Sequence, residues 1–350
     1  MTGVSVCMIV KNEEEVLARC LDSLKGIYDE LIIVDTGSTD NTKMVARKYT
    51  DLVYDYAWED DFSAARNFSI SKAKYDYVYT ADADEIIDEE NRTRFIQLKT
   101  ALLPEVEVVE MAYANQLTHN TTSNFDIEFR PKLFRRLRPF QFVDPIHEVL
   151  RTDPIVYRSN VVIRHNPTSD HGGRDLKVFA GMVQKGQLFS SRLEMMYARE
   201  LMIAGKLEDF RAARPYFERV RSDPSKASEV LRRASCVLTR YAAMENSGEL
   251  LLRFAAPELV GQPPAEICCA LGDYYLSSGD EQQAADWYAA ALSGAQPELV
   301  AASVGSLPLA GLSKCFRRAG DMERAAYYKE KAENWNPEAL NPDRQNIEEE

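Results

Sequence analysis

The stretch SVCMIVKNEEEVLARCLDSLKG, residues 5–26, changes from the pattern of a strand to the pattern of a helix. Its first six residues form a short run rich in β-forming apolar side chains, which is typical of a buried strand. From Glu13 onward the apolar residues fall three and four positions apart, and this run stops at Gly26. The stretch therefore predicts one strand followed by one amphipathic helix.

The same alternation continues through the next sixty residues. Three further strand-like runs, ELIIVD, DLVYDYAW and DYVYTAD, are separated by STDNTKMVARKY and DDFSAARNFSISKAK, which have helical character. Four strands joined by three helices predict right-handed crossovers and a mostly parallel sheet that is covered on both faces. Ligands bind such sheets at the carboxyl ends of the strands, so residues just after each strand are the first candidates for a site.

The rest of the chain divides into a β-rich part and a helical part. Residues 104–167 contain the runs EVEVVEMAY, FRPKLFRRL and SNVVIRH, which predict that a mixed sheet completes the first domain. Beyond Asp175 the pattern is helical, and LGDYYLSSGDEQQAADWYAAAL has the spacing of a tetratricopeptide unit. A plain helical bundle is the alternative, because the copies are unevenly spaced. We expect domains at 1–170 and 171–340, followed by a polar tail at 341–350.

Composition narrows the class of protein. The 350 residues carry a net charge of −13, which argues against binding to nucleic acid or to an anionic membrane surface. No apolar run is long enough for a membrane span, and glutamates follow the first strand where a signal peptide would stay apolar. The six cysteines show no paired spacing, which predicts reduced, buried thiols. A cytoplasmic protein is expected.

Asp82 and Asp84 are the sharpest chemical signal. They follow the buried run YVYTA at positions i and i+2, so both carboxylates can project to one side. Two hard oxygen ligands suit Mg²⁺ or Mn²⁺, with phosphate oxygens and water at the remaining positions. A solvated acidic turn is the alternative for an isolated triplet of this kind, but its place after the fourth strand favours the metal site.

Two further residues suit a phosphate-bearing ligand. Asp35 ends the run ELIIVD and is placed to accept a hydrogen bond from a base or ribose. Arg66 lies on a predicted helix and would supply the fixed cation that a diphosphate needs in an acidic chain. The alternative for Arg66 is a surface pair with Asp60 or Asp61. Neither a dinucleotide fingerprint nor a P-loop is present.

The histidines and remaining carboxylates leave alternatives open. His147 and His165 follow strand-like runs and are candidate metal ligands, although a lone histidine is more often structural. Glu148 is a candidate general base, and a surface glutamate is equally consistent with its position. Glu85 lies beside Asp84, and two roles are consistent with its position: support of the metal site, or general base.

Together these residues resemble a known family. The segments CMIVKNEEEVLARCLDSL, ELIIVDTGSTDNT, DFSAARNFSI and YVYTADADE look like the GT-A nucleotide-diphospho-sugar-binding domain of family-two inverting glycosyltransferases. The segment PKLFRRLRPFQFVDPIHEVL and the helical repeats look like the branch with C-terminal tetratricopeptide units, which includes bacterial enzymes that glycosylate peptides. The fold expected is α/β, a GT-A domain followed by an all-α repeat domain.

The resemblance implies roles for individual residues. Val10 to Glu13, including Asn12, and Asp35 would hold the nucleoside, and Arg66 would approach the base or phosphates. The remaining roles fall on the DxD triplet and on the IHE segment. Asp84 would ligate the metal, with Asp82 nearer the ribose and Ala83 in the same donor-binding segment. His147 would reach the metal or diphosphate. Glu148 would face the acceptor.

The implied reaction moves a sugar from a nucleotide-diphosphate donor, a UDP-sugar, to a hydroxyl or thiol with inversion. The acceptor is expected on a peptide or protein, with a cell-surface glycan or lipid-linked acceptor as the alternative, and the helical repeats offer a surface for a homodimer. A sugar nucleotidyltransferase would carry a glycine-rich, arginine-containing loop after the first strand, where VKNEEE stands instead. A non-catalytic repeat-based adaptor would not need the donor-binding residues. Processive polysaccharide synthesis is disfavoured, because Q-x-x-R-W is absent.

Overall fold

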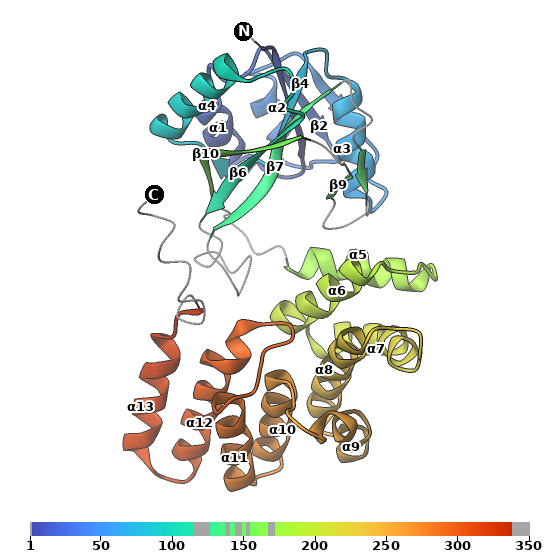
Figure 1. The fold of residues 1–350 in the computed structure, drawn as a ribbon, viewed down its shortest axis with the longest axis vertical. Coiled ribbons are helices and arrows are strands. Elements are labelled where there is room, and N and C mark those ends of the chain that lie inside the picture. The colour runs from blue at the N-terminus through green and yellow to red at the C-terminus, as the bar shows by residue number, and fades with distance from the viewer. Residues whose placement is uncertain are drawn as a thin grey trace. The chain divides into compact units, whose positions relative to one another are not determined.

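The computed structural model describes residues 2–114, 127–136, 141–143, 149–151, 155–166 and 172–337. Internal contacts divide the chain into two compact units, Met1–Asp170 and His171–Glu350. The first unit combines strands with helices and the second is helical (Figure 1). The predicted tail at 341–350 lies outside the described residues.

The amino-terminal part of the first unit follows the predicted alternation of strand and helix. Its elements are β1 (Val4–Val10), α1 (Leu17–Ser23), β2 (Glu30–Asp35), α2 (Thr42–Ala46), β3 (Val53–Asp55), α3 (Phe62–Ser71) and β4 (Tyr77–Ala81). β1 pairs in parallel with β2 and with β4, and β2 pairs in parallel with β3. The parallel sheet predicted from the alternation is therefore confirmed, and the carboxyl ends of its strands meet at one edge.

The later strands complete a mixed sheet, as predicted. They are β5 (Glu85–Ile86), β6 (Val108–Ala114), β7 (Glu128–Arg135) and β10 (Val156–His165), and α4 (Glu89–Ala101) follows β5. The strand order is β3-β2-β1-β4-β7-β6-β10-β5. β7 is antiparallel to both β4 and β6, whereas β10 is parallel to β6. A separate antiparallel pair joins β8 (Gln141–Val143) to β9 (Val149–Arg151).

Both faces of the sheet are buried. Along β1 the side chains alternate: Val6 and Met8 belong to the cluster that includes residues of α1 and α4, and Cys7 belongs to the cluster on the other face. Helices α1 and α4 lie on one side of the sheet and α3 lies on the other (Figure 1). This two-sided burial explains why the first strands read as continuous apolar runs.

The second unit is built from consecutive helices. They are α5 (Gly172–Gln184), α6 (Ser191–Ala204), α7 (Leu207–Arg221), α8 (Ser228–Met244), α9 (Gly248–Ala255), α10 (Ala265–Ser277), α11 (Glu281–Leu292), α12 (Ser306–Arg318) and α13 (Met322–Glu333), with short 3-10 helices η1 (Ala256–Leu259) and η2 (Ala301–Val304). Tyr288 of α11 packs against Gly272 of α10 and Gly311 of α12, where a β-carbon would collide with its ring. The helix pairs match the predicted pattern, and their assignment as tetratricopeptide units stays a prediction.

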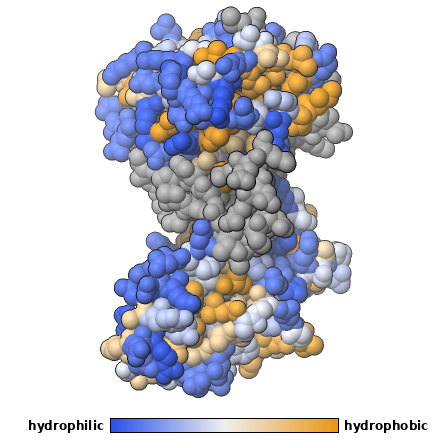
Figure 2. Space-filling view, turned by 60° about the vertical axis from the view of Figure 1, so that its left-hand side comes forward, coloured by the Kyte–Doolittle hydropathy of each residue, from blue (hydrophilic) through white to orange (hydrophobic). Residues whose placement is uncertain are grey.

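Several expectations from composition can be compared with the structure. All six cysteines are free and buried, which confirms the predicted thiols. Within the described ranges, none of the helices combines the length and apolar character needed to cross a bilayer. Hydrophilic side chains cover much of the visible face of each unit, with hydrophobic patches between them (Figure 2).

Candidate active site

The loops that follow β1 and β2 are tied together by side chains from both. Asn12 Oδ1 accepts a hydrogen bond from the Thr39 amide at 2.8 Å, and the Asn12 amide donates to Ser38 Oγ at 2.9 Å. The Glu13 amide donates to Thr42 Oγ1 at 2.7 Å. Asn12 has a φ of 55°, a left-handed conformation that asparagine tolerates better than most residues. The predicted segment from Val10 to Glu13 is therefore a fixed rim at the carboxyl edge of the sheet.

Asp35 lies at the end of β2, directly beside Val10 in the parallel register. It is 1% exposed, and its Oδ1 accepts hydrogen bonds from the Gly37 and Ser38 amides at 3.0 and 2.9 Å. Gly37 has a φ of 102°, which only glycine adopts easily, and this turn brings both amides to the carboxylate. Among the described residues, Oδ2 has no hydrogen-bond partner. That buried acceptor suits an N–H or O–H donor on a ligand.

Arg66 comes from α3, in the crossover that leads to β4. Its guanidinium is buried and donates from Nη2 to Asp82 Oδ1 at 3.1 Å. Arg66 is therefore a buried residue paired with Asp82 and not an exposed one, and its approach to a diphosphate stays a prediction. Partial burial alone would raise the pKa of Asp82, but the charges of Arg66 and Lys132 hold that pKa well below its ordinary value.

Asp84 meets His165, which ends β10. Asp84 Oδ2 lies 3.0 Å from His165 Nε2, and both side chains are largely buried. The antiparallel pairing of His165 with Glu85 and the hydrogen bond from the Asn166 amide to the Asp84 carbonyl at 3.0 Å fix this approach. The sequence separation of 81 residues shows that the sheet creates the pair.

The Asp84–His165 pair fits a divalent cation. Two neighbouring ligands of an octahedral ion, each about 2.1 Å from the metal, lie about 3 Å apart. Carboxylate oxygen and imidazole nitrogen are both accepted by Mn²⁺, and Mg²⁺ is commonly held by one or two carboxylates with water and phosphate. No group of three or more His, Cys, Asp or Glu side chains that could hold a metal occurs within the described ranges. Any further ligands must therefore come from the substrate, from water or from residues outside those ranges.

Glu85 and Lys132 form a buried ion pair next to the Asp82–Asp84 segment. Lys132, on β7, donates from Nζ to Glu85 Oε1 at 2.6 Å, and Glu85 is 2% exposed. Burial raises the pKa of Glu85 to about 7, although the Lys132 ammonium opposes the rise. In this structure the Glu85 carboxylate contacts Lys132 on β7 of the same sheet. This geometry suits structural support of the Asp82–Asp84 segment better than removal of a proton from an acceptor.

The remaining predicted residues are placed as follows. Val10 is buried at the end of β1, and Ala83 is buried between the two aspartates. His147 and Glu148 lie outside the described residues. Three residues beside these carboxylates were not predicted from the sequence. Lys132 pairs with Glu85, Tyr113 packs beside His165, and Arg130 lies over the Tyr113 ring. A signal for Arg130 and Lys132 was available, because they occupy alternate positions of a strand that is otherwise largely apolar and therefore point to one face.

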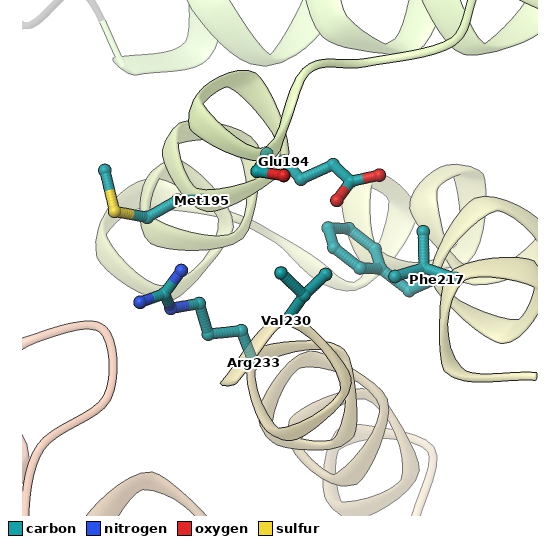
Figure 3. A pocket seen from close by; sticks show the side chains of 7 residues that line it. Glu194, Met195, Phe217, Val230 and Arg233 are labelled. Carbon is teal, nitrogen blue, oxygen red and sulfur yellow. The ribbon is translucent and has the colours of Figure 1, made fainter. Parts of the chain in front are cut away.

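Two cavities among the described residues lie away from these side chains. One, within the second unit, is lined by residues of α6, α7 and α8, among them Glu194, Phe217 and Arg233 (Figure 3), and its volume of about 10 Å³ holds at most about one water molecule. The other is an open groove that includes Glu30, Leu31 and Tyr75, at the amino ends of the strands. The hydrogen-bonded carboxylates described above lie at the opposite edge, where the strands end.

The amino-terminal unit matches a known protein family. Residues 5–165 match the family described as Glycosyl transferase family 2. A TPR repeat-containing protein of Synechococcus elongatus is 37% identical over 152 residues, which are 43% of this chain and 36% of that protein. The SPbeta prophage-derived glycosyltransferase SunS of Bacillus subtilis is 29% identical over 144 residues, 40% of this chain and 33% of that protein. The chain thus spans about a third of the length of these relatives.

Two solved structures match the chain at low identity and with low TM-scores. Glucosyl-3-phosphoglycerate synthase of Mycobacterium tuberculosis, crystallised with Mg²⁺ and UDP, is 17% identical with a TM-score of 0.37, covering 54% of this chain and 82% of that one. TarS 1-349 of S. aureus is 16% identical with a TM-score of 0.36, covering 94% and 90%. The family match and the mixed sheet confirm the predicted GT-A class and the resemblance on which it rested. Residues 5–165 therefore form a glycosyltransferase family 2 domain.

Proposed function

We propose that this chain is a metal-dependent, inverting glycosyltransferase that moves a sugar from a UDP-sugar to a hydroxyl or thiol of an acceptor, on a peptide or protein. The observation that carries the proposal is the carboxyl edge of the sheet. There Asp35 ends β2, the Arg66–Asp82 pair joins α3 to the residues that follow β4, and the Asp84–His165 pair joins those residues to the end of β10. The family match supports glycosyl transfer as the reaction.

Donor binding follows from these contacts. Asp35 Oδ2 would accept a hydrogen bond from the base or ribose, and the rim from Val10 to Glu13 would border the nucleoside. Asp84 and His165 would hold Mg²⁺ or Mn²⁺, and His147 is the further predicted ligand. A divalent ion at this position supplies electrostatic stabilisation for the charge that develops on the departing diphosphate.

Arg66 prepares the site before the donor arrives. Its guanidinium is already fixed by Asp82, so little side-chain freedom is lost when a phosphate approaches. The low pKa of Asp82 keeps that carboxylate ionised throughout the physiological range and keeps Arg66 oriented. An acceptor activated by a carboxylate, for which Glu148 is the predicted residue, would attack the anomeric carbon from the face opposite the diphosphate and invert its configuration.

The test is a screen of nucleotide sugars for hydrolysis and transfer with Mn²⁺ or Mg²⁺. We expect turnover of a UDP-sugar, its loss in EDTA, and a fall of about 1,000-fold in Asp84→Ala, because the metal contributes several kcal/mol to the transition state. Glu89→Gln is the matched control, since Glu89 begins α4 five residues away with a side chain that is 77% exposed. Turnover of no donor, or equal turnover by Asp84→Ala, would contradict the proposal.

A further inference from the structure

Tyr113 lies beside the imidazole that faces Asp84. It belongs to β6, which pairs with β10, and its register partner on that strand is Ile163, two residues before His165. The ring centroids of Tyr113 and His165 are 5.3 Å apart with the planes inclined at 34°. Residues in this diagonal relation on neighbouring strands share one face of a sheet. Tyr113 thus packs on the ring of a proposed metal ligand.

Arg130 reaches Tyr113 from the strand on the other side. Its guanidinium carbon lies 4.1 Å from the Tyr113 ring centroid, and β7 and β10 flank β6 in the sheet. Lys132 Nζ, two residues along β7, lies 5.8 Å from the same centroid. A cation at such distances is attracted to the face of an aromatic ring, and the attraction grows when the ring is buried, as Tyr113 is. The ring is therefore held from both neighbouring strands.

These contacts form one continuous chain from Arg130 through Tyr113 and His165 to Asp84. The successive distances are 4.1 Å from guanidinium to ring, 5.3 Å from ring to ring and 3.0 Å from imidazole to carboxylate. An imidazole that could turn freely would have to be ordered each time a cation binds, at a cost in affinity. Packing that fixes the ring beforehand removes this cost.

We propose that Tyr113, held by Arg130, is a positioning residue that keeps the His165 imidazole directed at Asp84 for divalent-cation binding. The inference rests on the proposed function only in taking Asp84 and His165 as the metal pair. The chemistry assigned to Tyr113 is that of its ring and not of its hydroxyl. Substitution by phenylalanine should therefore preserve the effect, and substitution by leucine should remove it.

The experiment measures Mn²⁺ binding to the full chain by electron paramagnetic resonance, with and without UDP. Tyr113→Leu should weaken Mn²⁺ binding about tenfold or more, the scale seen when a group that orients a metal ligand is lost. Tyr113→Phe should stay within about twofold of the native Kd because it retains the stacked ring. Arg130→Gln should weaken binding by a smaller factor, and Arg130→Lys should restore part of it.

A matched control separates positioning from general packing. Phe129 is also an aromatic residue of this sheet under an arginine, with the Arg158 guanidinium carbon 4.4 Å from its ring centroid. Phe129→Leu should leave Mn²⁺ binding unchanged. Melting temperatures in EDTA are compared for all variants, and if Tyr113→Leu does not fold, Arg130→Gln decides.

Native Mn²⁺ binding that is lost in Asp84→Ala, but kept in both Tyr113→Leu and Arg130→Gln, would overturn this inference and leave the proposed function standing. An equal loss in Phe129→Leu would also overturn it, because the effect would then be one of packing. Absence of Mn²⁺ binding to the native chain, with and without UDP, would overturn both proposals.

Discussion

Glu85 in the sheet unit and Glu266 in the helical unit are both buried glutamates, 2% and 1% exposed. Glu266 accepts hydrogen bonds from the consecutive backbone amides of residues 298–300, at 2.8 to 3.1 Å, through both of its oxygens. Glu85 receives one ammonium on Oε1, and its Oε2 has no hydrogen-bond partner among the residues that the structure describes. The two carboxylates are thus similarly buried, but Glu266 accepts hydrogen bonds at both oxygens and Glu85 at only one among the described residues.

The difference separates a structural carboxylate from one at a site. Backbone amides of a loop donate hydrogen bonds to Glu266 and tie that loop to α10. Both oxygens of the buried carboxylate therefore have hydrogen-bond donors. Glu85 belongs to a group of mutually compensating charges beside Asp82 and Asp84, where burial raises its pKa to about 7. A carboxylate with a perturbed pKa thus lies at the edge where the donor is proposed to bind.

The largest effect should come from breaking the satisfied carboxylate. Glu266→Ala leaves the amides of residues 298–300 without their acceptor, and we expect a loss of about 3–5 kcal/mol in the free energy of unfolding. Urea denaturation of the full chain measures it. Glu330→Ala, an exposed site on α13, is the control and should change stability by less than about 0.5 kcal/mol. A loss below about 1 kcal/mol for Glu266→Ala would show that the loop does not depend on this residue.

Glu85 should instead make stability depend on pH. Because its folded pKa of about 7 exceeds the unfolded value of 4.5, the native state holds a proton that the unfolded state releases. The resulting stabilisation is fully present below pH 4.5 and is lost as the pH rises through 7. Between pH 5 and pH 8 the native chain should therefore lose up to about 3 kcal/mol relative to Glu85→Gln.

Urea denaturation in EDTA at both pH values tests this prediction. Lys132→Met supplies an independent check, because removal of the opposing ammonium should move the midpoint of the loss to higher pH. Parallel pH profiles for the native chain and Glu85→Gln would show that burial does not perturb this carboxylate.

A smaller loss of stability is expected where helices of the second unit pack closely around a glycine. Gly311→Ala would place a β-carbon against the ring of Tyr288, and overpacking of this kind costs about 1–3 kcal/mol. Gly181→Ala on α5 is the matched control. Apart from its chain neighbours and the backbone of its own helix, no described atom lies within 4 Å of the added carbon, and alanine favours helix by about 0.5–1 kcal/mol. Thermal unfolding of both variants measures the contrast. Equal stability of the two would mean that the α11 interface is loosely packed.

The sequence predicted the elements better than the contacts between them. The first four strands and their helices follow from local periodicity, and Asp35, Asp82 and Asp84 could be placed because they end strands. The partners could not be predicted in this way. Asp84 meets His165 through the pairing of β5 with β10, and Lys132 reaches Glu85 through β7 inserted between β4 and β6. Long-range register decides such contacts, and periodicity does not encode it.

The most direct measurement is calorimetric binding of UDP to the full chain in Mn²⁺ and in EDTA. If Asp84 and His165 hold a cation that also contacts the diphosphate, UDP should bind at least about tenfold more tightly in Mn²⁺, and Asp84→Ala should remove that gain. Equal affinity for UDP in Mn²⁺ and EDTA, or an undiminished gain in Asp84→Ala, would contradict the assignment of this edge as a metal-dependent donor site.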